Sequence, residues 1–291
     1  MKRIQHVGDK YGHYDVGVEV EERDYNIPKH VIMPDLKVEP FTFGAVGDIY
    51  EDSANAPIMA KVLAAEDSFF LGLGDYTHAD AQEGISKWGD ILPTARFGCV
   101  GNHESCGGCS QAWMNFFGQN SWNSSLTYKG VTFISVNTET SDTSNLDPDA
   151  SAAQSRGDWI ILTLHRPIYT AAGSHTPDEG GIGNSTVPLV DKYNIAMVLQ
   201  GHNHNYQRSF PMKDGTPTAA GNDYQLNQGT IWIVAGTGGD PNYPINDHPG
   251  FNAFELGETG GFVKVDVTAN RLAGTFVDNS GDTKDTFSIS R

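Results

Sequence analysis

Five short polar motifs constrain the fold of this chain more than any other feature of its sequence. Each stands at the end of an apolar run that reads as a β-strand. In chain order they are Gly47-Asp48, Gly74-Asp75, Gly101-Asn102-His103-Glu104, His165 and Gly201-His202-Asn203-His204. Carboxylate, amide and imidazole donors delivered in this way suit a pair of divalent or trivalent metal ions. We therefore expect a fold that gathers strand ends around metal ions.

The first three strand-like runs alternate with helical patterns. The runs span residues 41–47, 69–74 and 96–101. Between them, apolar residues recur at helical spacing over residues 58–63, and residues 80–91 read as a second helix. This alternation predicts a parallel sheet with right-handed crossovers. Ligands of such sheets bind beyond the carboxyl ends of the strands, where Asp48, Asp75 and Asn102 stand.

The remainder of the chain reads as more strands separated by loops. We expect a hairpin over residues 126–136 with its turn near Gly130. Further strands are expected at 159–164, 195–200, 229–235, 261–267, 271–278 and 286–289. Residues 138–157 are rich in Ser, Thr, Asp and Ala, so we expect an exposed loop there. Loops that could line the rim of a site are expected at 105–112, 170–185 and 240–252.

The composition limits the partners that the chain can have. The 36 acidic residues outnumber the 19 basic ones and give a formal charge of −17, which argues against a general nucleic-acid binder. An anionic substrate remains compatible with this charge, because bound metals reverse the local field. No apolar run approaches the roughly 18 residues of a membrane span. The first residues lack the apolar core of a secretory signal.

Three cysteines are present, and two of them are close in sequence. Cys106 and Cys109 enclose two glycines just after the third motif. A structural zinc site would need a second such pair, which the chain lacks. A small local disulfide is our preferred interpretation, and two free thiols are the alternative. Cys99 is left over in a strand-like stretch, so we expect it to be buried and inert.

The histidines gather at the same strand ends. Six of the ten fall in or next to the motifs, namely His78, His103, His165, His175, His202 and His204. The order of the motifs resembles that of the calcineurin-like metallophosphoesterases, and within them the purple acid phosphatases. The segments 165–169, 201–208 and 235–239 support the resemblance, which covers about residues 41–291. It implies an α/β fold of four layers, in which two mixed sheets pack face to face with helices outside.

Residues 1–40 are polar and punctuated by prolines, so we expect an N-terminal extended arm or a short strand pair there, followed by one catalytic domain at residues 41–291. The resemblance implies a dinuclear metal centre, in which Asp75 would bridge both metals. Asp48 and His204 would bind the first metal, which is Fe3+ in purple acid phosphatases. The second metal, Fe2+, Zn2+ or Mn2+, would be bound by Asn102, His165 and His202.

The chain departs from the family pattern at two positions. Purple acid phosphatases have a tyrosine ligand three residues after the bridging aspartate, and His78 stands there in this chain. Other members of the superfamily have a histidine two residues after the first aspartate, where this chain has Tyr50. Our hypothesis is that Tyr50 supplies a phenolate to the first metal and that His78 lies near the substrate. The alternative is that Tyr50 only packs against the site and that a water molecule completes the coordination of the first metal.

The function that the resemblance implies is the hydrolysis of phosphate monoesters of small molecules. A metal-bound hydroxide would attack phosphorus in line, and His103 and His175 would stabilise or protonate the leaving group. A phosphodiesterase or nuclease on the same metal core is the first alternative, which His78 favours. A non-catalytic scaffold with this fold is the second. Family analogy further suggests a secreted, extracellular or periplasmic protein, and the oligomeric state stays open.

Overall fold

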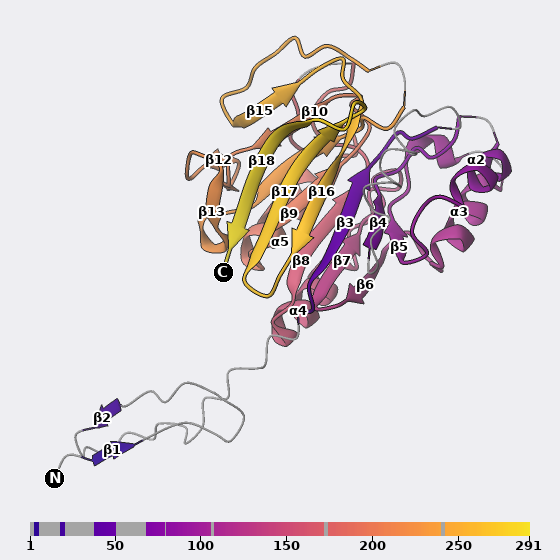
Figure 1. Cartoon of the computed structure of the whole chain (residues 1–291). Coiled ribbons are helices and arrows are strands. Elements are labelled where there is room, and N and C mark those ends of the chain that lie inside the picture. Colours follow the sequence, from indigo (N-terminus) through magenta and orange to yellow (C-terminus); the bar gives the residue numbers. More distant parts are fainter. Residues whose placement is uncertain are drawn as a thin grey trace. The chain divides into compact units, whose positions relative to one another are not determined.

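The chain forms two compact units, Met1–Asp35 and Leu36–Arg291 (Figure 1). The structure is a computed structural model that describes residues 3–5, 18–20, 38–50, 68–78, 80–105, 108–171, 174–239 and 242–291. In the first unit, β1 (Arg3–Gln5) pairs antiparallel with β2 (Val18–Val20). The helix predicted at residues 58–63 lies outside the described residues, and the predicted domain boundary at residue 40 stays a prediction.

A seven-stranded mixed sheet carries the first three motifs of the second unit. Its strand order is β13-β18-β17-β16-β3-β4-β5. The strands are β3 (Phe41–Val46), β4 (Ser68–Gly72), β5 (Arg96–Gly98), β13 (Asp223–Gln225), β16 (Gly261–Val267), β17 (Arg271–Asp278) and β18 (Thr283–Ser290). β3, β4 and β5 are parallel neighbours, as the alternation of strands and helices predicted. Their carboxyl ends therefore meet at one edge of the sheet.

A second seven-stranded sheet carries the fourth and fifth motifs. Its order is β15-β10-β14-β9-β8-β7-β6. The strands are β6 (Ser124–Tyr128), β7 (Val131–Ser135), β8 (Trp159–Leu164), β9 (Met197–Gln200), β10 (Tyr206–Ser209), β14 (Ile231–Ala235) and β15 (Asn252–Leu256). The predicted hairpin is confirmed, and Lys129 and Gly130 form its two-residue loop with φ of 48° and 81°. Two positive φ angles define the turn whose twist matches that of the paired strands.

The two sheets pack face to face through a core of aromatic and branched side chains. Phe133 of the second sheet contacts Phe43 and Phe69 of the first, with ring centroids 5.4 and 4.7 Å apart. Side chains alternate along each strand, so Phe69 of β4 enters this inner core while Phe70 faces the outer side. Both sheets are therefore covered on two faces, and strands such as β4 and β8 read as continuous apolar runs.

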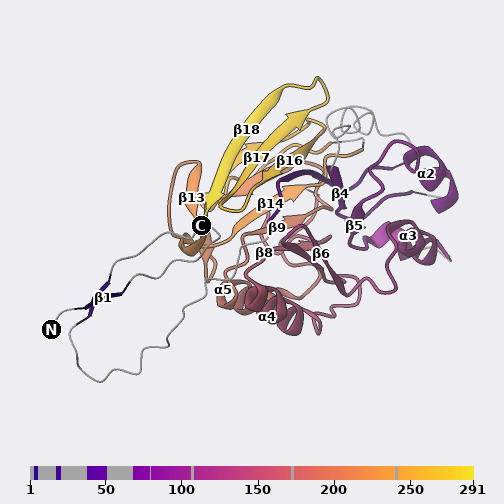
Figure 2. The ribbon, with the colours of Figure 1, turned by 60° about the horizontal axis from the view of Figure 1, so that its bottom comes forward.

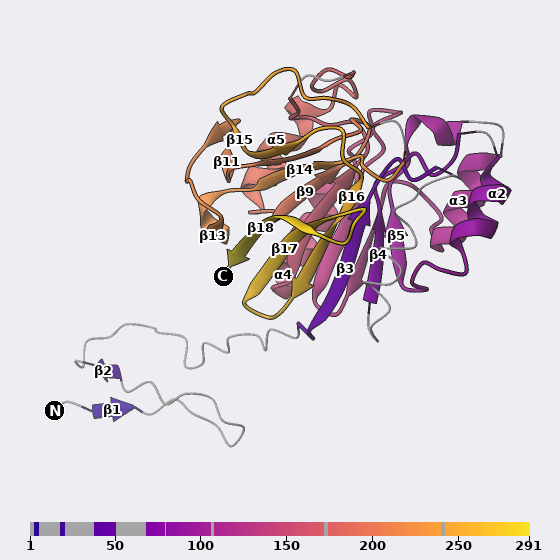
Figure 3. The same ribbon diagram turned by 45° about the horizontal axis from the view of Figure 1, so that its top comes forward.

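Helices form the two outer layers. Figure 3 shows α2 (Ala81–Trp88) and α3 (Cys109–Phe117) beside β4 and β5, with Trp88 and Trp113 in the same apolar cluster as Phe70. Figure 2 shows α4 (Leu146–Arg156) and α5 (Gly183–Lys192) along the second sheet. The predicted four-layer sandwich is confirmed. The smaller described elements are η1 (Asn102–Ser105), η2 (Leu226–Gln228), β11 (Met212–Lys213) and β12 (Thr216–Pro217).

The prediction of an exposed loop at residues 138–157 is wrong, because α4 occupies most of it. Leu146, Ala150 and Ala153 recur at helical spacing and are buried against the second sheet. Gly157 ends the helix with a φ of 76°. The many small polar residues of the segment face outward and hid this short apolar stripe. Three rim loops were also predicted too long, since α3 begins at Cys109, α5 at Gly183 and β15 at Asn252.

Two remaining predictions concern cysteines and membranes. Cys109 is disulfide-bonded, in agreement with the preferred interpretation, while Cys106 lies outside the described residues. Cys99 is a free, fully buried thiol, and burial raises its pKa well above the usual value. It is therefore held as an inert thiol. Within the described part of the chain, none of the helices has the length and apolarity to cross a membrane.

Candidate metal centre

Unusual backbone conformations mark the ends of the strands where the motifs meet. Asp48, Tyr50, Asp75 and His202 have φ angles of 58°, 49°, 53° and 68°. Residues other than glycine rarely adopt positive φ, and such conformations gather at functional sites where surrounding contacts hold them. Gly101 is needed for a different reason, since a Cβ there would overlap the backbone and carboxylate of Asp75. The chain therefore packs its backbone tightly to aim these side chains at one point.

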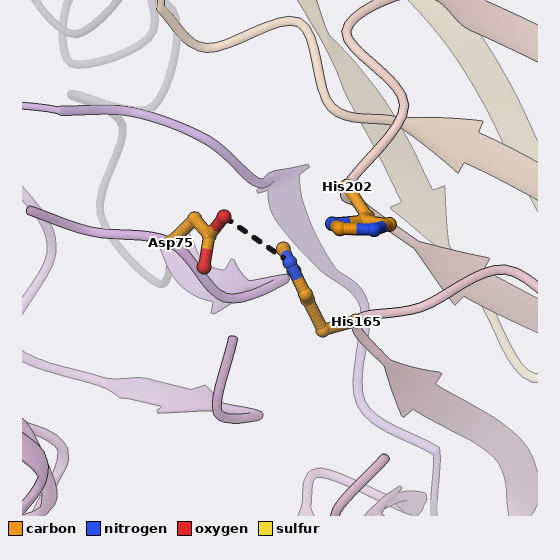
Figure 4. Close-up of side chains that lie close together, drawn as sticks. All are labelled: Asp75, His165 and His202. Carbon is orange, nitrogen blue, oxygen red and sulfur yellow. Dashed lines mark ion pairs between the residues drawn. The ribbon is translucent and has the colours of Figure 1, made fainter. Parts of the chain in front are cut away.

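Asp75, Asn102, His165 and His202 form one group of ligand-type side chains. His165 Nε2 lies 3.2 Å from Asp75 Oδ2 and 3.1 Å from Asn102 Oδ1. The other nitrogen of His165, Nδ1, donates to the carbonyl of Leu73 at 2.8 Å, which orients the ring. Ligand atoms of Asp75, His165 and His202 all lie within 4.8 Å of one another (Figure 4). These three side chains are buried, so their charges act in a medium of low dielectric.

This geometry determines the protonation state of His165. Burial opposes the charged ring, but the Asp75 carboxylate outweighs burial and raises the pKa of His165 to about 10. Burial likewise opposes the charge of Asp75, while His165 lowers the pKa of that carboxyl well below its usual range. The two side chains thus form an ion pair at neutral pH. A metal cation would take the place of the proton.

Asp48, His204 and Tyr50 form a neighbouring group. His204 Nε2 lies 3.3 Å from Asp48 Oδ1 and 3.0 Å from the Tyr50 hydroxyl. Asp48 Oδ2 accepts a 2.9 Å hydrogen bond from the backbone N–H of His202. Asp48 Oδ1 is buried, and because its 3.3 Å contact with His204 does not have the geometry of a hydrogen bond, this oxygen has no hydrogen-bond partner among the described residues. A buried carboxylate oxygen without a hydrogen bond is costly unless a cation compensates it, so this donor set fits a metal ion.

Tyr50 and His78, the two positions at which the chain departs from the family pattern, lie side by side in the structure. The rings of the two residues stack, with centroids 3.3 Å apart and an angle of 17° between planes. His78 also meets His103 edge to face at 4.9 Å. Burial, and then the charges of Asp48 and Asp75, raise the pKa of Tyr50 well above its usual value. A phenolate at Tyr50 therefore requires a strong cation beside it, which leaves the ligand hypothesis a prediction.

His103 and His175 lie on the more accessible side of the two groups. Their side chains are 36% and 32% exposed. His103 donates its backbone N–H to Asp75 Oδ1 at 2.9 Å, and its Nε2 lies 3.8 Å from Asp75 Oδ2. The ring of His175 lies 3.7 Å from that of His202, and burial lowers the pKa of His175. The side chain of Asn203 bonds both the N–H and the C=O of His175, at 3.2 and 3.3 Å.

Glu104 belongs to the third motif, but its sequence did not indicate a role. Its buried carboxylate accepts the backbone N–H groups of Asp75, Tyr76 and Gly101 at 2.9, 2.7 and 2.8 Å. Burial and the charge of Asp75 raise the pKa of Glu104 to about 8. The side chain therefore joins the segments that follow β4 and β5 and fixes the spacing of Asp75 and Asn102.

A set of charged residues beside His202 was not predicted at all. Arg166 binds Glu139 with two nitrogens, at 2.8 and 2.9 Å, and reaches Glu179 at 3.1 Å. Glu179 Oε2 in turn lies 3.1 Å from His202 Nε2 and 3.5 Å from His175 Nδ1. Burial opposes the charge of Glu179, but the N–H of Thr176 and the His202 ring outweigh it, giving a pKa of about 2. Glu179 lies in a predicted rim loop, and no spacing in the sequence singled it out.

The four layers and the clustered donors indicate a fold that gathers metal-type ligands at the ends of its strands. Residues 41–206 match the family model described as calcineurin-like phosphoesterase, so the chain belongs to that family. The predicted membership is thereby confirmed. Membership of this family implies a divalent metal centre, and the clustered Asp and His side chains could hold one.

Similar proteins agree with this placement. Over 153 residues the chain is 29% identical to "Probable inactive purple acid phosphatase 1" of Arabidopsis thaliana, covering 49% of this chain and 25% of that protein. Over 88 residues it is 31% identical to "Nucleotide pyrophosphatase/phosphodiesterase" of Hordeum vulgare, covering 28% and 24% of the two proteins. The chain thus spans a quarter or less of the length of these curated relatives.

Solved structures resemble this one over most of the chain. A purple acid phosphatase from yellow lupin (Lupinus luteus) seeds matches with a TM-score of 0.72 and 19% identity, over 88% of this chain and 55% of that one. GAP50, the anchor in the inner membrane complex of Plasmodium, matches with a TM-score of 0.68 and 14% identity, over 86% and 89%. Identities this low show the shared fold alone.

Proposed function

We propose that this protein is a dinuclear metal-dependent phosphatase that hydrolyses phosphate monoesters of small molecules. The observation that carries the proposal is the pairing of two buried groups, Asp48 with His204 and Asp75 with His165, at 3.3 and 3.2 Å. Asp48 Oδ1 makes no hydrogen bond to the described residues, which supports a cation at the first group. Bound there, two metal ions would supply an activated water and stabilise charge on the phosphoryl oxygens.

The side chains of the proposed site divide into two kinds. Asp75 would bridge the two metals, and the other ligands would hold one metal each. These ligands are Asp48, Tyr50 and His204 for the first, and Asn102, His165 and His202 for the second. Fe3+ at the first metal and Fe2+, Zn2+ or Mn2+ at the second would follow the purple acid phosphatases, as would a secreted or periplasmic location.

His103 and His175 would contact the substrate. Both are about one-third exposed and lie beside a ligand, His103 beside Asp75 and His175 beside His202. A protonated imidazole at either position could donate to a phosphoryl oxygen or to the leaving oxygen. The activity should then fall as pH rises above the pKa of the donor. Arg166 is less suited to this task, since Glu139 and Glu179 already bind its guanidinium.

The test combines metal analysis, a visible spectrum and an assay on one purified sample. We expect two tightly bound metals per chain and hydrolysis of p-nitrophenyl phosphate that a chelator abolishes. Iron with a broad band near about 500–600 nm would support a phenolate on Fe3+. A protein that carries two metals but lacks the band would refute the tyrosinate alone. Fewer than two metals, or full turnover after complete metal removal, would refute the proposal.

A phosphodiesterase is the second candidate, and the position of His78 favours it. His78 stacks on Tyr50 and meets His103 at 4.9 Å, so a third imidazole stands beside the substrate-facing side. The relative from Hordeum vulgare is named "Nucleotide pyrophosphatase/phosphodiesterase". Faster turnover of bis(p-nitrophenyl) phosphate than of the monoester would favour this candidate. A metal-loaded protein with neither activity would favour the non-catalytic scaffold.

A further inference from the structure

Glu179 contacts the ring of His202, and the proposed mechanism gives this carboxylate no role. One oxygen, Oε2, lies 3.1 Å from His202 Nε2 and 3.1 Å from an Arg166 nitrogen. The other oxygen accepts the backbone N–H of Thr176 at 2.7 Å. The carboxylate is therefore held in place by its own loop and by a guanidinium, with one oxygen aimed at the imidazole.

This contact determines which nitrogen of His202 carries the proton. A carboxylate can only accept, so Nε2 must donate to Glu179, and the lone pair is left on Nδ1. Arg166 also lies 3.2 Å from Nε2, but it has an acceptor of its own in Glu179. Figure 4 shows a ring nitrogen of His202 on the side that faces Asp75 and His165. This arrangement leaves a ligand nitrogen directed at the second group of donors.

We propose that Glu179 is a positioning residue for the second metal, holding His202 in the tautomer and orientation that binding requires. The inference rests on the proposed function, because it takes His202 as a ligand. Carboxylates that accept from metal-binding histidines raise ligand basicity, and their loss typically weakens metal affinity by about 10–100-fold. Glu179 is well suited to this role, because its carboxylate, which is 25% exposed, reaches the ring of His202, which is only 3% exposed.

Arg166 offers a competing explanation that the structure allows us to separate. Glu139 binds Arg166 through two bonds of 2.8 and 2.9 Å. If Glu179 acted only by holding Arg166, then removing Glu139 would produce a similar defect. If Glu179 acts on His202 directly, Glu139→Ala should leave the affinity for the second metal nearly unchanged. Glu139 thus provides a matched control for charge, side-chain size and contact with Arg166.

The experiment is a titration of the metal-free protein with Co2+, followed by absorption of the bound ion. Wild type, Glu179→Ala, Glu179→Gln and Glu139→Ala are compared, and Asn102→Ala identifies the step that belongs to the second metal. We expect Glu179→Ala to weaken that step by about 10–100-fold and to leave the other unchanged. Glu179→Gln keeps an acceptor oxygen, so it should restore part of the affinity. Near-UV circular dichroism would check that each variant is folded.

Each result bears on the proposal. Unchanged Co2+ affinity in Glu179→Ala would overturn it, as would an equal loss in Glu139→Ala. Complete loss of the second step, with no rescue by Gln, would overturn it by making Glu179 a direct ligand. A wild-type protein that binds two metals and hydrolyses the monoester would uphold the proposed function whatever the Glu179 variants do. The two claims therefore fail separately.

Discussion

A buried ion pair joins the two sheets, and we expect its disruption to lower the stability of the fold strongly. Arg208 lies on β10 of the second sheet and Asp285 on β18 of the first. The guanidinium donates to both carboxylate oxygens, at 2.6 and 2.9 Å, and Tyr206 donates to one of them at 2.8 Å. Arg208 is fully buried, and Asp285 is only 5% exposed.

The substitution Asp285→Ala removes the anion and leaves the guanidinium buried. Breaking a buried pair in this way costs about 3–5 kcal/mol of unfolding free energy. An unfolding entropy of about 2 cal/mol/K per residue amounts to about 0.5 kcal/mol/K for a unit of this size. The melting temperature should therefore fall by about 6–10 °C. Replacing both partners with apolar residues, Arg208→Met with Asp285→Leu, should recover much of the loss.

Thermal unfolding followed by far-UV circular dichroism would measure this effect. Asp147→Ala is the control, because its 2.8 Å pair with Lys192 is about half exposed on both sides. Exposed pairs add little to stability, so the melting temperature of this variant should stay close to that of the wild type. The reasoning would be refuted if Asp285→Ala and Asp147→Ala shifted the melting temperature equally.

Three further predictions concern the metal centre. The proton that Asp75 holds on His165 must leave when a metal binds, so the affinity for the second metal should rise about tenfold per pH unit below pH 10. Calorimetric titration in several buffers would detect the released proton. Tyr50→Phe should bind iron but lack the visible band, and a band that persists would exclude this phenolate. Gly101→Ala should lower the bound metal per chain, whereas Gly250→Ala, whose Cβ meets no atom within 4 Å, should bind as wild type does.

Most strand positions were predictable because the buried strands leave a local signal, whereas β10, β13 and β15 were not predicted. In β4, Phe69 faces the inner core and Phe70 the outer helices, so a sheet covered on both faces needs an unbroken apolar run. α4 lacked such a signal, since only Leu146, Ala150 and Ala153 of its residues are buried. Its existence depended on the sheet against which this narrow stripe packs. A helix with so short an apolar stripe among small residues is therefore recognised only from its tertiary contacts.

The candidate site divides along the same line. The gathering of the donors that follow β3, β4 and β5 was predictable, because parallel neighbouring strands place their carboxyl ends at one edge of a sheet. The neighbours of those donors do not follow from it. Glu179 lies 23 residues from His202 in a loop, and Glu139 and Arg166 come from two other segments. No periodicity relates these positions.

By itself, the sequence determined the positions of most buried strands and the identity and order of the metal-type donors, because apolar runs, glycines at turns and polar residues at strand ends are local patterns. The four-layer architecture was implied only by the resemblance of these motifs to the calcineurin-like metallophosphoesterases. Only the tertiary structure decided which donors approach one another, that Tyr50 lies 3.0 Å from His204, and that a carboxylate stands behind His202. Such contacts join segments far apart in the chain, and their distances are set by how two sheets pack and not by any spacing along the sequence.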